Sequence, residues 1–74
     1  MAETKINRIK ETLKEKGRTQ TWLAQKLGKT FRIVNDYCSN KVQPPLEVLY
    51  KIAVLLEVSP KNLLIEPQNE IRVL

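Results

Sequence analysis

The chain has 74 residues, of which 42% are hydrophobic, and its 13 lysines and arginines against 8 acidic residues give a net charge of +5. One domain is all that this length allows, and a single cysteine with no histidine excludes a disulfide and a structural zinc site, which needs about four ligands. No apolar run approaches the ~18 residues of a membrane span. We therefore expect a cytoplasmic protein without metal or cofactor, and the positive charge favours polyanionic partners.

Two short helices are predicted on either side of Gly17. Ile6, Ile9 and Leu13 recur at the spacing of a helical apolar stripe, and Gly17 ends this first helix. Thr19 then offers a side-chain oxygen as the N-cap of a second helix. The inward residues of the second helix are expected to be Leu23, Ala24 and Leu27.

A third helix is predicted from Thr30 to Cys38, again with a threonine as its N-cap. Val34 and Tyr37 are its expected core residues. Asn40 is the candidate for the left-handed residue that ends it, because asparagine tolerates a positive φ better than other non-glycine residues.

Pro45 predicts the first position of a fourth helix, where a fixed φ and a missing N–H cost nothing. Its expected core face is Leu46, Leu49, Ile52, Ala53 and Leu56. The same helix carries further apolar residues, namely Val48, Tyr50, Val54 and Leu55. A helix that is apolar nearly all round is buried on more than one side. We therefore predict a homodimer through this helix, the last turn and the tail Ile71–Leu74.

Ser59-Pro60 repeats the cap-then-proline signal and predicts a short fifth turn at Leu63 and Leu64. The predicted fold is thus all-α, a compact domain of five helices in residues 1–66. Residues 67–74 are predicted to be a C-terminal tail that is flexible or contacts the dimer partner.

The spacing of Ala24, Gly28 and Val34 carries the functional prediction. Two helices that meet at a steep angle approach closely, so they need a small residue at Ala24 and a glycine turn at Gly28. Val34 then packs the second of them onto the first. This spacing inside two capped helices is typical of a DNA-binding helix-turn-helix.

The segment Thr19–Gly28 (TQTWLAQKLG) resembles the Thr-Gln-x-x-Leu-Ala-x-x-x-Gly signature of the phage-repressor/Cro-like (XRE-type) helix-turn-helix proteins. Cys38-Ser39-Asn40-Lys41 stands where that family often has Glu-Asn-Gly-Lys, and the similarity covers roughly residues 6–64. The resemblance implies a five-helix, repressor-like globule that binds double-stranded DNA as a dimer, with the third helix in the major groove. It further implies phosphate contacts from Gln20, Lys41 and Gln43, and base contacts from Phe31, Arg32 and Asp36.

The chemistry of these side chains agrees with such roles. Arg32 has the donors for guanine O6 and N7, Phe31 can contact a thymine methyl, and Asp36 can accept from a cytosine amino group if Arg32 pairs with it. Asn35 is a candidate adenine contact. Further phosphate contacts are expected from residues at the starts of the second and third helices, namely Thr19, Lys29 and Thr30.

Other functions remain open at this stage. An enzyme is not expected, because the chain has no histidine, no glycine-rich phosphate loop and no paired carboxylates. A protein-interaction module, such as an antitoxin or adaptor domain, is the alternative to a transcriptional regulator. A repressor and a restriction–modification controller are equally compatible with the sequence, and no small-molecule ligand is expected. We interpret Trp22 as a partial lid over the core and Cys38 as a small semi-buried residue.

Overall fold

The structure is a computed structural model and describes residues 5–66. Over that range the chain forms four α-helices and one 3₁₀ turn: α1 (Ile9–Glu15), α2 (Gln20–Leu27), α3 (Phe31–Cys38), α4 (Leu46–Leu56) and η1 (Pro60–Leu63). The all-α prediction is confirmed, although the fifth helix is only a single 3₁₀ turn. None of the helices in this range is long and apolar enough to cross a membrane.

The ends of α2 and α3 are set by local chemistry. The Oγ1 of Thr19 accepts from the N–H of Trp22 at 3.0 Å, and the Oγ1 of Thr30 accepts from the N–H of Ile33 at 3.2 Å. Both threonines are therefore the N-caps that the sequence predicts. Gly28 ends α2 with φ +68°, and a Cβ there would meet no atom within 4 Å. The turn thus needs glycine for its backbone conformation and not for space.

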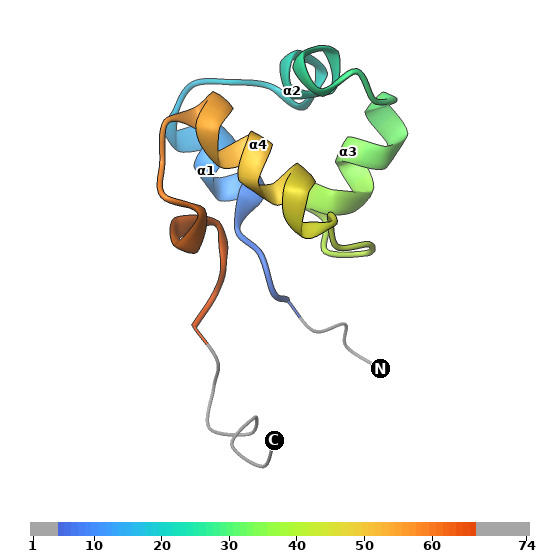
Figure 1. The fold of residues 1–74 in the computed structure, drawn as a ribbon. Coiled ribbons are helices and arrows are strands. Elements are labelled where there is room, and N and C mark those ends of the chain that lie inside the picture. Colours follow the sequence, from blue (N-terminus) through green and yellow to red (C-terminus); the bar gives the residue numbers. More distant parts are fainter. Residues whose placement is uncertain (1–4, 67–74) are drawn as a thin grey trace.

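The helices enclose one hydrophobic core. Figure 1 shows α4 crossing in front of α1, with α2 and α3 joined by their short turn at the other side of the molecule. α2 packs on both α3 and α4, α1 packs on α3, and η1 packs on α4. The buried apolar residues are Ile9, Leu13, Leu23, Ala24, Val34, Tyr37, Cys38, Val48, Leu49, Ile52, Ala53, Leu56 and Leu63.

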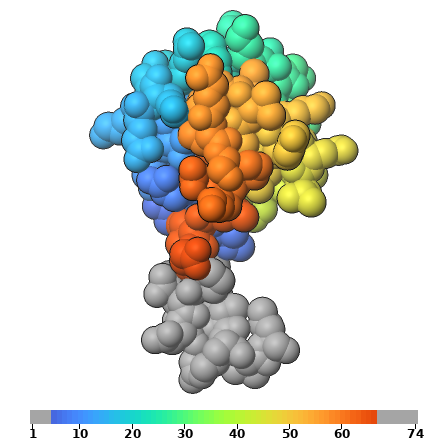
Figure 2. Space-filling model, turned by 60° about the vertical axis from the view of Figure 1, so that its left-hand side comes forward, coloured from blue at the N-terminus to red at the C-terminus, as the bar shows by residue number. Residues whose placement is uncertain are grey.

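The segment before α1 pairs with the segment after η1. The N–H of Arg8 donates to the carbonyl of Leu63 at 2.9 Å, and the N–H of Ile65 donates to the carbonyl of Ile6 at 2.8 Å. In Figure 2 the residues from the end of α4 to Glu66 form a strip between α1 and α4. The prediction that Ile6 belongs to the first helical stripe is wrong, because α1 begins only at Ile9, and Ile6 pairs with Ile65 and is 44% exposed.

The core face of α4 differs from the predicted one at two positions. Leu46 was expected in the core but is 79% exposed, whereas Val48 is buried. At about 100° per residue, the buried arc spans Val48 to Ala53, and Leu46 lies beside that arc in the first turn. α4 also begins at Leu46, so Pro45 is its N-cap and not its first residue.

A buried polar cluster joins the start of the chain to the end of α3; we call Asn7, Asn40 and Gln43 the asparagine clamp. The Oδ1 of Asn40 accepts from the backbone N–H groups of Ile6 and Asn7, at 2.8 and 2.9 Å, and from the Nε2 of Gln43 at 3.0 Å. Its Nδ2 donates to the carbonyl of Asn7 at 3.0 Å. Asn40 has φ +63°, as predicted for the residue that ends the third helix.

Asn7 completes the clamp from the other side. Its Nδ2 donates to the carbonyl of Tyr37 at 3.0 Å and to the Oε1 of Gln43 at 2.7 Å. Its Oδ1 accepts from the N–H of Ile9 and so satisfies a donor at the start of α1. The side chain is 1% exposed, so water cannot replace these partners.

We expect Asn7→Ala to lower the free energy of unfolding by about 1–3 kcal/mol, because it leaves buried hydrogen-bonding groups without partners. Urea denaturation measures this loss as a lower midpoint at unchanged slope. Asn62→Ala is the matched control, since Asn62 is exposed on η1 and should change stability by less than about 0.5 kcal/mol. Equal midpoints for the two variants would refute a stabilising role for the clamp.

Candidate nucleic-acid interface

α3 has a buried face and an exposed one. Val34, Tyr37 and Cys38 are at most 5% exposed and anchor the helix in the core. On the opposite side Phe31 is 53% exposed, and the Arg32, Ile33 and Asn35 side chains are also open to solvent. The apolar Phe31 and Ile33 share this surface with polar groups, so it offers both hydrogen bonds and apolar contact.

Of the four predicted base-contacting residues, Phe31, Arg32 and Asn35 are exposed and Asp36 is half-buried. Arg32 and Asp36 do not form an ion pair, because the ion pairs within residues 5–66 are Lys5–Glu11 and Arg8–Glu15. An exposed ion pair contributes little to stability, so the fold does not depend on one between Arg32 and Asp36. The Arg32 guanidinium therefore keeps its donors for another acceptor.

A hydrogen bond that sequence reasoning missed joins α2 to α3. The Nδ2 of Asn35 donates to the Oε1 of Gln20 at 2.9 Å. Gln20 is the first residue of α2, so the bond links the start of one helix to the exposed face of the next. The Nε2 group of Gln20 stays available as a donor. No spacing rule in the sequence indicates this contact, which depends on the angle between the helices.

Apart from Gln20, the predicted phosphate-contacting residues fall into three groups. Thr19 and Thr30 use a lone pair as N-caps and keep their hydroxyl hydrogens for donation. Lys29 is half-buried in the turn between α2 and α3, and Lys41 is exposed just after α3. Gln43 differs from the others, because both ends of its amide are engaged in the asparagine clamp.

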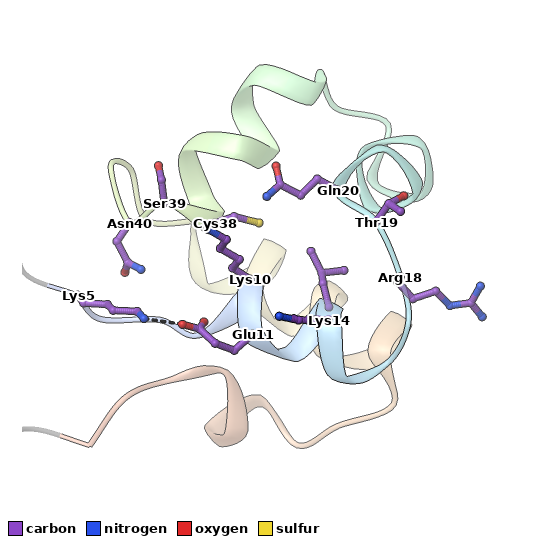
Figure 3. Close-up of a pocket in the computed structure, with 11 residues that line it drawn as sticks. Lys5, Lys10, Glu11, Lys14, Arg18, Thr19, Gln20, Cys38, Ser39 and Asn40 are labelled. Carbon is purple, nitrogen blue, oxygen red and sulfur yellow. Dashed lines mark hydrogen bonds and ion pairs between the residues drawn. The ribbon is translucent and has the colours of Figure 1, made fainter.

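An open groove of about 770 Å³ lies between α1, the start of α2 and the end of α3 (Figure 3). α1 supplies Lys10 and Lys14 to one wall, and the residues around the α2 N-terminus and the α3 C-terminus supply the others. In the part of the chain that the structure describes, the lining residues are Lys5, Lys10, Glu11, Leu13, Lys14, Arg18, Thr19, Gln20, Cys38, Ser39 and Asn40. The groove thus brings the predicted phosphate contacts Thr19 and Gln20 together with cations that the sequence analysis did not assign to a site.

The pKa values of two side chains that line the groove, Glu11 and Cys38, differ from their ordinary values. The hydrogen bond from Lys5 lowers the pKa of Glu11, so this carboxylate stays ionised and neutralises Lys5. Desolvation raises the pKa of the Cys38 thiol to about 11. A thiol with this pKa is almost fully protonated at neutral pH and is a poor nucleophile. Cys38 is only 4% exposed, so it lies deeper than the predicted semi-buried place, and it contributes packing to the core.

Trp22 is half-buried and packs against the core, which agrees with its interpretation as a partial lid. The guanidinium carbon of Arg18 lies 4.6 Å from the centroid of the indole ring. This cation–π contact fixes the segment between α1 and α2 against the outer surface of α2.

Within residues 5–66 no group of histidine, cysteine and acidic side chains is arranged to hold a metal ion.

Comparison with known proteins agrees with this geometry. A crystal structure of a protein from Bacteroides fragilis that is thought to bind DNA superposes with a TM-score of 0.80. It is 48% identical to this chain, and the similarity covers 81% of this chain and 97% of that one. No curated protein matches the chain. Residues 9–63 match the family model described as Helix-turn-helix (HTH_3). The chain therefore belongs to the XRE-type helix-turn-helix DNA-binding family that its sequence resembles.

Proposed function

We propose that the protein is a sequence-specific regulator of transcription that places α3 in the major groove of double-stranded DNA. The observation that carries this proposal is the exposed face of α3, where Phe31, Arg32 and Asn35 project from a helix that the core holds rigidly. The major groove admits one α-helix and presents a distinct pattern of donors and acceptors for each base pair. The similarity to the Bacteroides fragilis protein supports the same function.

Each exposed side chain has a defined complement on a base edge. Arg32 donates to O6 and N7 of guanine, and Phe31 contacts a thymine methyl group. Asn35 keeps its Oδ1 and one N–H after bonding Gln20, which suits the N6 and N7 groups of adenine. Asp36 can accept from the amino group of cytosine when Arg32 turns to pair with it, a pair that is absent in the free domain.

The phosphate contacts place α3 and carry no sequence information themselves. We assign them to residues at both ends of the helix-turn-helix, namely Thr19, Gln20, Lys29, Thr30 and Lys41. Gln43 belongs to this set through its backbone N–H, because its side chain serves the asparagine clamp.

We further propose that the regulator is a homodimer, and the outer face of α4 supports this. Leu46, Tyr50 and Val54 stand at i, i+4 and i+8 and are 79%, 61% and 62% exposed, so they form an apolar ridge. Val48 and Leu55 pack on the core and do not belong to it. The tail Ile71–Leu74, which the sequence analysis assigned to the same interface, lies outside the described residues. A two-fold dimer would bind half-sites about one helical turn, ~34 Å, apart.

Such a regulator acts by occupying its operator, as a repressor or as a restriction–modification controller, in a bacterial or phage-type cytoplasm. A protein-interaction module is the second candidate, and the exposed Phe31 and Ile33 favour it because apolar side chains mark protein contacts as well. The two candidates differ in the effect of α3 substitutions on DNA binding.

Arg32→Ala is expected to weaken binding to a selected operator by about 1–3 kcal/mol and to relax the preference at one base pair. Selection of binding sites from randomised duplexes, repeated with the variant, measures both effects. The stability of the domain should not change, because the side chain is exposed and has no partner within residues 5–66. A variant that selects the same sequence with the same affinity would favour the protein-interaction module.

Lys41→Ala is expected to weaken binding to all sequences alike, because a phosphate contact is independent of the base. The slope of log affinity against log salt should fall by about 0.9, the value for one released counterion. Lys61→Ala serves as the control, since Lys61 is exposed on η1 at a site without a proposed role. A sequence-dependent loss for Lys41→Ala would contradict its assignment to the backbone.

Val54→Glu is expected to weaken self-association at least tenfold, because it places a charge on the apolar ridge. Sedimentation of the wild type and the variant over a range of concentrations measures this change. Asn62→Glu controls for the added negative charge at an exposed site outside the ridge. A wild-type protein that stays monomeric at every concentration, with and without duplex DNA, would rule the dimer out.

A further inference from the structure

The basic groove of Figure 3 lies beside the surface to which the proposed function assigns base contacts. Its lining in residues 5–66 contains the cations Lys5, Lys10, Lys14 and Arg18 and the single carboxylate Glu11. Glu11 is paired with Lys5. Lys10 and Lys14 are exposed and make no ion pair with any carboxylate among residues 5–66. The groove therefore holds uncompensated positive charge, which concentrates anions in a concave surface.

The two lysines stand on one face of α1. They are four residues apart, so their side chains are neighbours on the helix surface. In Figure 3 the Lys10 side chain extends from α1 toward Cys38 on the opposite wall, and Lys14 lies farther along the same helix. They lie opposite the hydroxyl of Thr19, which accepts from Trp22 and keeps its hydrogen as a further donor, whereas the Ser39 hydroxyl already donates to the carbonyl of Asp36.

The position of the groove identifies a strand of duplex DNA as the anion. Its walls include both ends of the helix-turn-helix, Thr19 and Gln20 at the start of α2 and Ser39 at the end of α3. Gln20 is also bonded to Asn35 on the exposed face of α3. The major groove is about 12 Å wide and a helix with side chains fills most of it, so a bounding strand must pass directly beside α3.

We propose that Lys10 and Lys14 of α1 bind the phosphate backbone of the DNA strand that borders the major groove. This inference rests on the proposed function and extends its DNA contact from the helix-turn-helix to α1. The strand lies in the groove and is held by α1 on one side and by Thr19 and Gln20 on the other. Binding there is independent of sequence, because phosphates are the same at every base pair.

The double variant Lys10→Gln/Lys14→Gln tests the proposal. Its affinity for a short duplex of mixed sequence is measured across ~50–200 mM salt. We expect the slope of log affinity against log salt to fall by roughly 1.8, twice the ~0.9 of one phosphate contact, and the affinity at ~0.1 M salt to fall roughly 10- to 60-fold. The matched control is Lys16→Gln/Lys61→Gln, which removes the same charge at exposed sites outside the groove.

The control separates local contact from net charge, because charges farther away than the ~8–10 Å Debye length are screened. Equal slopes for the double variant and its control would overturn the proposal while leaving DNA binding itself established. A wild type that does not bind the duplex at all would instead refute the proposed function and, with it, this extension. Circular dichroism confirms that both variants remain folded, which their exposed positions lead us to expect.

Free phosphate ions share the chemistry of the DNA backbone, so a second measurement distinguishes them. Thermal denaturation is compared in inorganic phosphate and in chloride at equal ionic strength. We expect no selective effect of phosphate on the midpoint of the wild type. A midpoint that phosphate raises in the wild type and not in Lys10→Gln/Lys14→Gln, together with unchanged duplex slopes, would assign the groove to a small anion and overturn its assignment to a strand.

Discussion

The orientation of α3 depends on the hydrogen bonds of the asparagine clamp. Asn40 ends the helix in a left-handed conformation and binds the chain before α1, while Asn7 binds the carbonyl of Tyr37 in the last turn of α3. Such a cluster is stabilising only when all its groups are paired, because buried polar groups without partners are costly. The clamp fixes the C-terminal end of α3 as the cap at Thr30 fixes its start. The exposed face of the helix can then present side chains in one defined arrangement.

Features that depend on a few neighbouring residues were predictable from the sequence. The caps at Thr19 and Thr30, the glycine turn at Gly28 and the positive φ at Asn40 follow from the chemistry of single residues. The spacing that predicted the helix-turn-helix is likewise local, and the family model confirms it. Burial of Leu49, Ile52, Ala53 and Leu56 was also predicted correctly. The burial of Val48 in place of Leu46 was not predictable, because these two residues flank the apolar arc on opposite sides and their burial depends on where α2 and η1 pack.

In the interface, too, features set by neighbouring residues were predictable and features set by distant segments were not. Exposure of Phe31, Arg32 and Asn35 follows from the burial of Val34 and Tyr37 on the same helix. The amide of Gln43 could not be assigned from its position in the sequence, because its partners Asn7 and Asn40 come from two other segments. The basic groove escaped prediction for a similar reason. Its walls belong to three helices, and the lysines of α1 look like an ordinary solvated face until α1 is placed against α3.

The first and last described segments pair with each other, so the two ends of the domain lie side by side. Ile6 and Ile65 are joined by a backbone hydrogen bond of 2.8 Å although nearly the whole domain separates them in sequence. Contacts between such distant residues carry the largest loop-closure entropy and tend to form late in folding. Ends that lie side by side also tolerate circular permutation. The packing of the helices therefore does not depend on their order along the chain. If a short peptide joined residue 66 to residue 5, new termini could be placed in another loop.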